Sequence, residues 1–202
     1  NWNYGDHNKL LAQENAGQRA AIEFDLSILP PDAQVQSAEL RLYAVHSPTA
    51  GDVYVHALAD AWVEGTCGGS GCSADGITWG TRDGTNAWAT PGGDFVTPHA
   101  ARTAISGAGA WYAFDVTNAA GAWVATGTNH GLLIKGNANG VDVDFASSDE
   151  ANASLHPELE ITYTCSCGVC PPTTIGTVLM VSAGLPVSGP GGTFIVPTAQ
   201  EQ

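Results

Sequence analysis

The sequence predicts an all-β fold, an antiparallel two-sheet β-sandwich of jelly-roll-like form with one short helix and an extended C-terminal tail. Short segments in which apolar and polar residues alternate recur along the chain, and this alternation has the period of a half-buried strand. Clusters of Gly, Pro, Asn and Asp separate these segments at intervals of about 8–12 residues. Only one segment has the composition of a helix. Together these observations favour two packed antiparallel sheets.

Strands are expected at each alternating segment. In the first, Ile22, Phe24 and Leu26 alternate with polar residues, and the second places Leu40 and Leu42 on one face. The expected strands are residues 19–26, 35–45, 53–58, 110–116, 131–135, 141–146 and 159–164, with the helix at 118–126.

Residues 66–105 have a different composition, in which Gly, Thr, Asp and Pro predominate and tryptophans are isolated. Such a composition is typical of loops. We expect a long loop region here, with at most short strands at 77–79 and 94–96.

The charge of the chain is strongly acidic. There are 6 Lys and Arg against 20 Asp and Glu, for a formal net charge of -14. This balance disfavours binding to nucleic acid and to anionic membranes, and it disfavours an anionic polysaccharide unless Ca²⁺ intervenes. No apolar segment approaches the ~20 residues of a membrane span. Met180 is the only methionine, so we expect a mature secreted product, or one unit of a longer chain, at an extracellular or cell-surface location.

The five cysteines form two clusters. Cys67 and Cys72 flank the sequence GGSG, and Cys165, Cys167 and Cys170 form the sequence CSCGVC. Their spacing is a poor match to the usual zinc ligand patterns. We therefore expect an oxidising compartment, a local disulfide between Cys67 and Cys72, and one disulfide among the other three. The remaining thiol is free or bonded to another chain, and the spacing leaves open which cysteine it is.

Several segments of the sequence form a characteristic set through their order, their spacing and unusual details such as WATPGGD at 88–94 and ASSDE at 146–150. Together they resemble the DNRLRE-type domain, a secreted bacterial and archaeal β-sandwich related to a family of carbohydrate-binding modules. The resemblance implies a sandwich over residues 1–164. The CGGSGC insertion at 67–72 and everything after Thr164 depart from the family pattern, and there we expect a Cys-rich linker at 165–172 and an extended tail at 173–202. The resemblance also implies a capacity to bind carbohydrate. The segments that carry it are 3–5, 20–43, 60–66, 77–95, 111–136 and 145–164.

One departure from the family pattern concerns the first strand. In the family a strand precedes the turn that corresponds to Asn3-Tyr4-Gly5, but here only two residues do. The sequence GTFIVPTAQEQ at 192–202, followed by NWNYGDH at 1–7, has the form of the family's opening. We therefore predict that the first strand is displaced to the C-terminal end and consists of Thr193, Phe194, Ile195 and Val196.

A missing strand leaves unpaired backbone groups, each costing ~1–3 kcal/mol when buried, so the vacancy must be filled. The tail can insert into its own domain, into the next molecule, or into the next unit of a tandem array. The tail also carries a second apolar run at 175–183, whereas the prolines and glycines of 185–192 predict no regular element there. The residues expected to pair between subunits are Thr193, Phe194, Ile195 and Val196 with Thr177, Val178, Leu179 and Val181.

The resulting hypothesis is a structural subunit of an extracellular filament or tandem-repeat fibre, whose partners are copies of itself arranged head to tail. The alternative is a monomeric, secreted carbohydrate-binding module with a circularly permuted strand, whose partner is an extracellular polysaccharide. The loop residues Trp2 and Trp88 are the candidates for sugar contact, because an aromatic ring in a loop can offer its face to a ligand. Trp62, Trp111 and Trp123 lie in regular segments and are expected in the core.

No cofactor is expected, with one candidate exception. Asp142, Asp144, Asp149 and Glu150 form the densest group of carboxylates and are candidate ligands for a structural Ca²⁺, although alternating Asp on a strand is ordinarily a solvated face. The six histidines are scattered and form neither HExxH nor a set with the cysteines, and no GxSxG occurs. We therefore expect no enzyme. A single N-glycosylation sequon begins at Asn152.

Overall fold

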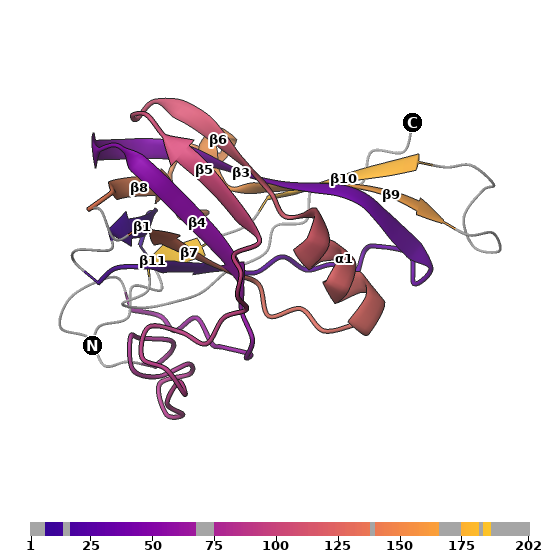
Figure 1. Ribbon diagram of the computed structural model, residues 1–202, viewed down its shortest axis with the longest axis horizontal. Helices are drawn as coiled ribbons and strands as arrows, with labels where there is room; N and C mark the ends of the chain where they lie inside the picture. Colours follow the sequence, from indigo (N-terminus) through magenta and orange to yellow (C-terminus); the bar gives the residue numbers. More distant parts are fainter. Residues whose placement is uncertain are drawn as a thin grey trace.

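The computed structural model describes residues 7–13, 17–67, 75–137, 140–165, 175–181 and 184–186. Strands make up most of the regular structure, and they form two antiparallel sheets with the helix α1 beside them (Figure 1), so the predicted all-β sandwich is confirmed. No described helix is long and apolar enough to cross a membrane. The elements are β1 (Lys9–Gln13), β2 (Ala20–Ile22), β3 (Ala33–Thr49), β4 (Gly51–Ala57), β5 (Ala101–Ile105), β6 (Ala110–Asp115), α1 (Thr117–Thr126), β7 (Leu132–Gly136), β8 (Asp142–Ala146), a 3₁₀ turn (Ala153–Leu155), β9 (Glu158–Cys165), β10 (Ile175–Val181) and β11 (Gly184–Pro186).

The two sheets differ in size. The six-stranded sheet has the order β1-β8-β3-β9-β10, and β6 also pairs with β3. The five-stranded sheet has the order β11-β2-β7-β4-β5. The long strand β3 organises the first sheet, because its residues 33–41 pair with β9 and its residues 44–49 pair with β8.

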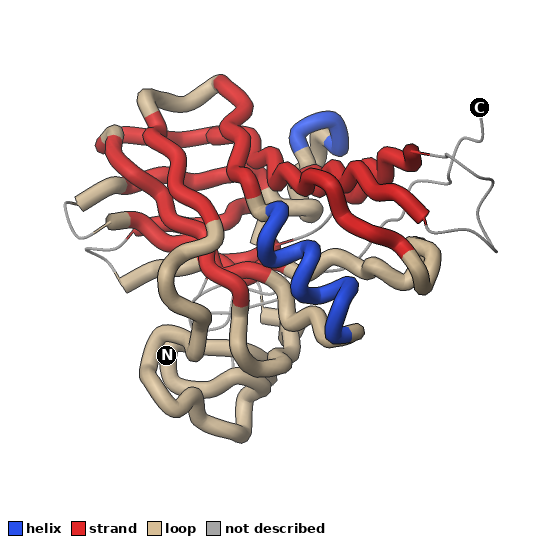
Figure 2. Tube along the Cα trace, turned by 45° about the vertical axis from the view of Figure 1, so that its right-hand side comes forward, coloured by secondary structure: helices blue, strands red, loops and turns tan. Residues whose placement is uncertain are grey.

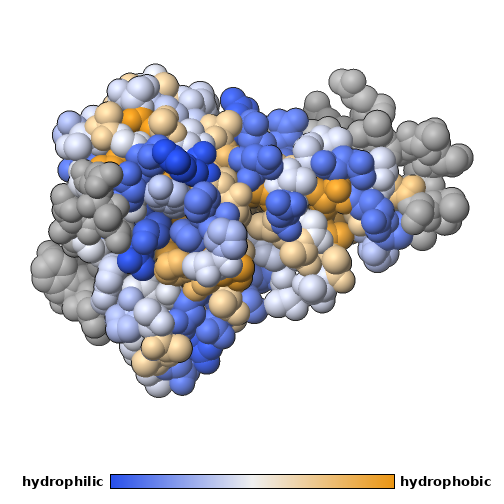
Figure 3. Space-filling view, in the orientation of Figure 1, coloured by the Kyte–Doolittle hydropathy of each residue, from blue (hydrophilic) through white to orange (hydrophobic). Residues whose placement is uncertain are grey.

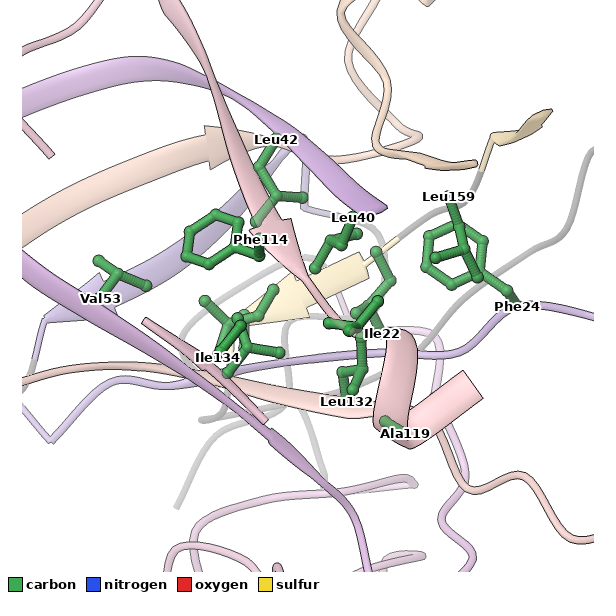
Figure 4. Packing of buried hydrophobic residues seen from close by; sticks show 14 of the residues in the cluster. Ile22, Phe24, Leu40, Leu42, Val53, Phe114, Ala119, Leu132, Ile134 and Leu159 are labelled. Atoms are coloured by element: carbon green, nitrogen blue, oxygen red, sulfur yellow. The ribbon is translucent and has the colours of Figure 1, made fainter. Parts of the chain in front are cut away.

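The main core lies between the sheets. On β3 the residues Ala38, Leu40, Leu42 and Ala44 are buried, as their alternation predicts. Buried residues of the other sheet, among them Val53 and Ile134, complete this core. Figure 4 shows Phe114 of β6, a neighbour of β3 in the same sheet, close to Leu42. The helix α1 matches the predicted segment, and it packs against β3 through the buried residues Ala119, Ala120 and Trp123.

The five-stranded sheet is covered on its outer face as well. The loop region between β4 and β5 folds over it and forms one end of the molecule (Figure 2). Within this layer Leu58, Ile77 and Trp88 pack on Ala21 and Leu133 to form a second apolar cluster. The strand predicted at 19–26 is shorter in the structure, because β2 ends at Ile22, and all three of its residues are buried since both faces of the sheet are covered here. Beyond it, Phe24 is buried between the more exposed Glu23 and Asp25, as the alternation predicts.

Three further elements differ from the sequence predictions. The strand β1 was not expected, since KLLAQ shows no alternation, and its middle three residues are all buried. The strand β5 lies within the predicted loop, whereas 77–79 and 94–96 form no strand beyond an isolated bridge between Leu58 and Phe95. The strand β11 includes Leu185 and Pro186, and it corrects the expectation of no regular element at 185–192 for these two residues. Pro186 is tolerated there because β11 lies at the edge of the described sheet.

The described part of the tail folds back onto its own chain. The strand β10, within the predicted apolar run, pairs with β9, and β11 pairs with β2. Exchange of Thr177, Val178, Leu179 and Val181 between subunits stays a prediction. The displaced strand at 193–196 lies outside the described residues.

Candidate functional site

One of the two predicted sugar contacts, Trp88, is buried in the structure. Trp88 is only 4% exposed, and its indole Nε1 donates a hydrogen bond to the carbonyl oxygen of Thr78 over 3.0 Å. A ring packed in the second apolar cluster has no face available to a ligand. The other predicted contact, Trp2, lies outside the described residues.

The remaining tryptophans differ in their burial. Trp123 is buried, as predicted. Trp62 is half-buried and donates a hydrogen bond to the carbonyl oxygen of His130 over 2.8 Å. Trp111 is also half-buried and lies on the outer face of the six-stranded sheet, where its ring contacts Tyr43.

The four carboxylates considered as Ca²⁺ ligands are not brought together. Asp144 is buried on β8, where Lys9 Nζ lies 3.0 Å from its Oδ2 and Gln13 Nε2 donates to its Oδ1 over 3.1 Å. Asp149 and Glu150 lie in the turn after β8. Among the described residues, which include all four, no three His, Cys, Asp or Glu side chains are placed to hold a metal ion.

Two of the five cysteines lie at the ends of described segments of the chain. Cys67 is buried at the end of its segment, and Cys165 ends β9. Cys72, Cys167 and Cys170 lie outside the described residues, so the predicted pairing stays a prediction.

A row of two cations and an aromatic ring crosses the outer face of the five-stranded sheet. Val53 and Val55 of β4 point into the core, so Tyr54 and His56 point outward. Tyr54 is directly opposite Arg102 on β5 and directly opposite Lys135 on β7. Because residues opposite one another in adjacent strands are neighbours, these three side chains form one line. We call Lys135, Tyr54 and Arg102 the cation–tyrosine row.

The row is partly open to solvent and is surrounded by aromatic rings. The side chain of Arg102 is 55% exposed, and its Nη2 lies 2.6 Å from Oδ2 of Asp52. The exposed ring of His99 meets the Tyr54 ring edge to face, with 4.7 Å between centroids. Lys135 Nζ lies 5.7 Å from the centroid of the Phe95 ring. Figure 3 shows strongly hydrophilic residues over the region where Figure 1 draws β4 and β5.

This face holds half of the basic residues of the chain. Arg19, Arg102 and Lys135 are three of the six Lys and Arg residues, and all three approach Phe95 or Tyr54. The hydrogen bond to Asp52 raises the pKa of the Arg102 guanidinium further. Burial, with the nearby charges of Lys135, His99 and Arg19, lowers the pKa of His56. The basic residues of the chain are thus concentrated around Phe95 and Tyr54, and Asp52 pairs with one of them.

A groove of about 640 Å³ adjoins the row. Residues of α1 line it on one side and residues 96–100 line it on the other. His99 lines the groove and also contacts Tyr54, so the groove and the row are continuous.

The opposite sheet carries a similar arrangement of aromatic rings beside a guanidinium. Tyr43 and Trp111 meet edge to face at 5.4 Å, and the Arg41 guanidinium lies 5.1 Å from the Trp111 ring. However, Arg41 Nη1 lies 2.7 Å from Oε2 of Glu158, and Arg41 also approaches Glu39. Its charge is therefore balanced locally.

Sequence reasoning missed the row for a specific reason. The alternation of residues 53–57 is sufficient to place Tyr54 on the outer face. Its neighbours Arg102 and Lys135 come from strands distant in sequence, and one of these strands, β5, was not expected at all.

The described elements define a two-sheet antiparallel β-sandwich. The model of one family, carbohydrate-binding module family 96, matches residues 1–163. The chain therefore belongs to carbohydrate-binding module family 96. This confirms the predicted relation to carbohydrate-binding modules, while the DNRLRE-type designation and the displaced strand stay predictions. Family members are binding modules and not catalysts, in keeping with the expectation of no enzyme. A search among curated proteins finds no match.

Proposed function

We propose that this chain is a secreted carbohydrate-binding module that binds an anionic polysaccharide through the cation–tyrosine row. The observation that carries the proposal is the alignment of Lys135, Tyr54 and Arg102 across three strands. The half-buried Tyr54 ring offers an apolar surface to a sugar ring. The two cations beside it can donate charge-assisted hydrogen bonds to carboxylate or sulfate groups on neighbouring sugars.

The net charge of -14 does not oppose this proposal at the distances that matter. At physiological salt, exposed charges more than about 8 Å apart are largely screened, so a ligand responds mainly to the charges that it touches. The row supplies its own cations, and the proposal therefore needs no bridging Ca²⁺.

The test is binding to a panel of polymers by affinity electrophoresis and calorimetry. The panel contains polygalacturonate, alginate and chondroitin sulfate, with dextran and starch as neutral polymers. We expect binding to at least one anionic polymer, and we expect it to weaken as NaCl rises from about 0.05 M to about 0.5 M. The double variant Lys135→Ala/Arg102→Ala should lose about tenfold or more in affinity, because it removes both cations that would donate charged hydrogen bonds to the polymer.

The matched control is Arg41→Ala. It removes a cation that is also on a sheet face, beside an aromatic ring, and in an ion pair. This variant should bind as the natural chain does. Equal losses in both variants, or binding to neutral polymers alone, would contradict the proposal.

A filament subunit is the other hypothesis from the sequence, and no observation in the described part of the chain favours it. The edges of β9 and β2 are paired by β10 and β11 of the same chain. A binding module therefore accounts better for the family match and for the row together.

A further inference from the structure

The groove beside the row has walls of a distinct chemistry. Its floor includes Ala57, Leu58 and Trp123, and its outer walls include Val96 and Ala122. Nine of its fourteen lining residues are apolar, and none is Asp, Glu, Lys or Arg. Val96 is 52% exposed, which is unusual for a large apolar side chain among the described residues. The groove therefore suits an uncharged group with apolar surface, since an ion would lose hydration there without gaining a counter-charge.

The rim of the groove supplies neutral hydrogen-bonding groups. Asn118, Thr128 and His130 line it, and within the described chain their side chains make no hydrogen bond. An amide, a hydroxyl and an imidazole can all donate to a carbonyl oxygen. An apolar floor with a few polar groups at the edge is the usual character of a small-ligand site.

The groove continues the surface proposed for the polysaccharide. His99 contacts the Tyr54 ring and also lines the groove, so a sugar stacked on Tyr54 has its neighbouring unit at the groove entrance. We infer that the groove binds an uncharged, O-acetylated sugar unit of the same polysaccharide, next to the anionic unit held by the row. This inference rests on the proposed function.

The acetyl group matches both parts of the groove. Its methyl group can contact the apolar floor at Leu58 and Trp123, and its carbonyl oxygen can accept a hydrogen bond from Asn118 or His130 at the rim. An unsubstituted sugar would place hydroxyl groups against methyl groups and leave them without partners, which costs free energy. The groove thus selects for acetylation, whereas the row selects for charge.

The test uses a small uncharged probe, so that it does not depend on binding by the row. Per-O-acetylated methyl galactoside and unacetylated methyl galactoside are each titrated into the full chain, and the backbone amide resonances are followed by NMR. We expect the acetylated probe to shift the amides of residues 96–100 and 118–126. The unacetylated probe should shift them much less.

The variant Ala122→Trp fills the groove from α1, and the matched control Ala125→Trp places the same ring on an exposed position of α1 outside it. We expect Ala122→Trp to bind the acetylated probe with an affinity about tenfold or more lower than that of Ala125→Trp. The amide spectrum should show that both variants fold. Absence of shifts at the groove, or equal binding by the two variants, would overturn the inference.

Failure of the proposed function is separate from failure of this inference. Binding by the row is measured with polyuronates and the variants Lys135→Ala/Arg102→Ala and Arg41→Ala. Binding in the groove is measured with an uncharged monosaccharide and the variants of α1. With a polysaccharide that carries both uronate units and neutral O-acetylated units, such as acetylated glucuronoxylan, the inference predicts tighter binding than to the same polymer after alkaline deacetylation. Equal binding of the two polymers would also overturn it.

Discussion

His56 is a buried titratable residue beneath the proposed binding surface. It is 8% exposed, its Nδ1 lies 3.0 Å from the carbonyl oxygen of Val96, and its ring is 4.4 Å from that of Phe95. Burial is the largest cause of its lowered pKa, and the charges of Lys135, His99 and Arg19 act in the same direction. The neutral imidazole is thus favoured beside Lys135 and Arg19.

The lowered pKa of His56 predicts a loss of stability in mild acid. Because the unfolded chain takes up this proton more readily, the stabilisation from neutral His56 is complete above about pH 6.5 and is lost as the pH falls from there toward the folded-state pKa. We expect NMR titration to give a pKa for His56 below that of an unfolded peptide. The free energy of unfolding, measured with urea, should decrease as the pH is lowered from about 8 to about 5.

The variant His56→Phe keeps a ring in this position and removes the titrating group. Its free energy of unfolding should depend less on pH over the same range, whatever its stability at neutral pH. If the unfolding free energy of His56→Phe depends on pH as that of the natural chain does, or if His56 has a normal pKa in the natural chain, the burial of this ring has no electrostatic consequence.

At the scale of elements, the loop region between β4 and β5 is held on the five-stranded sheet by Arg19, which directly precedes β2. Arg19 is 9% exposed, its guanidinium lies 4.6 Å from the centroid of the Trp79 ring, and its Nη1 donates to the carbonyl oxygen of Gly92 over 2.7 Å. Gly92 has a φ of +94°, and a Cβ there would lie 2.7 Å from Arg19 Nη1. Only glycine therefore lets the loop approach so closely.

Loss of Arg19 should loosen this loop more than it damages the core. We expect Arg19→Ala to lower the free energy of unfolding by about 2–4 kcal/mol, because it removes a buried charged hydrogen bond and a cation–π contact. Limited proteolysis followed by mass spectrometry should show faster cleavage within residues 59–100.

The control is Arg82→Ala, in the same loop. Arg82 Nη1 lies 3.3 Å from Oδ1 of Asp60, and both side chains are at least one-third exposed. The loss of such a surface ion pair should cost no more than about 1 kcal/mol. If both variants are cleaved at the same rate, Arg19 does not hold the loop.

At the scale of the whole molecule, the tail decides which sheet edges are open. The strands β10 and β11 pair with β9 and β2, and without them these two strands would present unpaired backbone groups. Open edges promote pairing between molecules.

Truncation after Thr174 tests the role of the tail. We expect the full chain to sediment as a monomer of 20.7 kDa and the truncated chain to associate or to lose stability, because truncation exposes both edges. Negative-stain electron microscopy should show no fibres of the full chain. Long fibres of the full chain that vanish on truncation would instead support the filament hypothesis and strand exchange through the tail.

The sequence was sufficient for the fold class and for the elements with clear periodicity. The alternation from Ala38 to Ala44 predicts both the central strand β3 and the face that it buries, and the segment 118–126 predicts α1. Such patterns are local, since they arise from the two-residue period of a strand and the packing of one face on a core. The relation to carbohydrate-binding modules also follows from the sequence.

The tertiary structure alone decided which residues form a surface together. Trp88 has the sequence context of an exposed loop residue, yet the loop folds over Ala21 and Leu133 and buries it. Conversely, nothing local joins Tyr54 to Arg102 and Lys135, because strand pairing between distant segments brings them into one row. Burial of a loop and alignment across a sheet depend on long-range contacts, which a local pattern of residues does not specify.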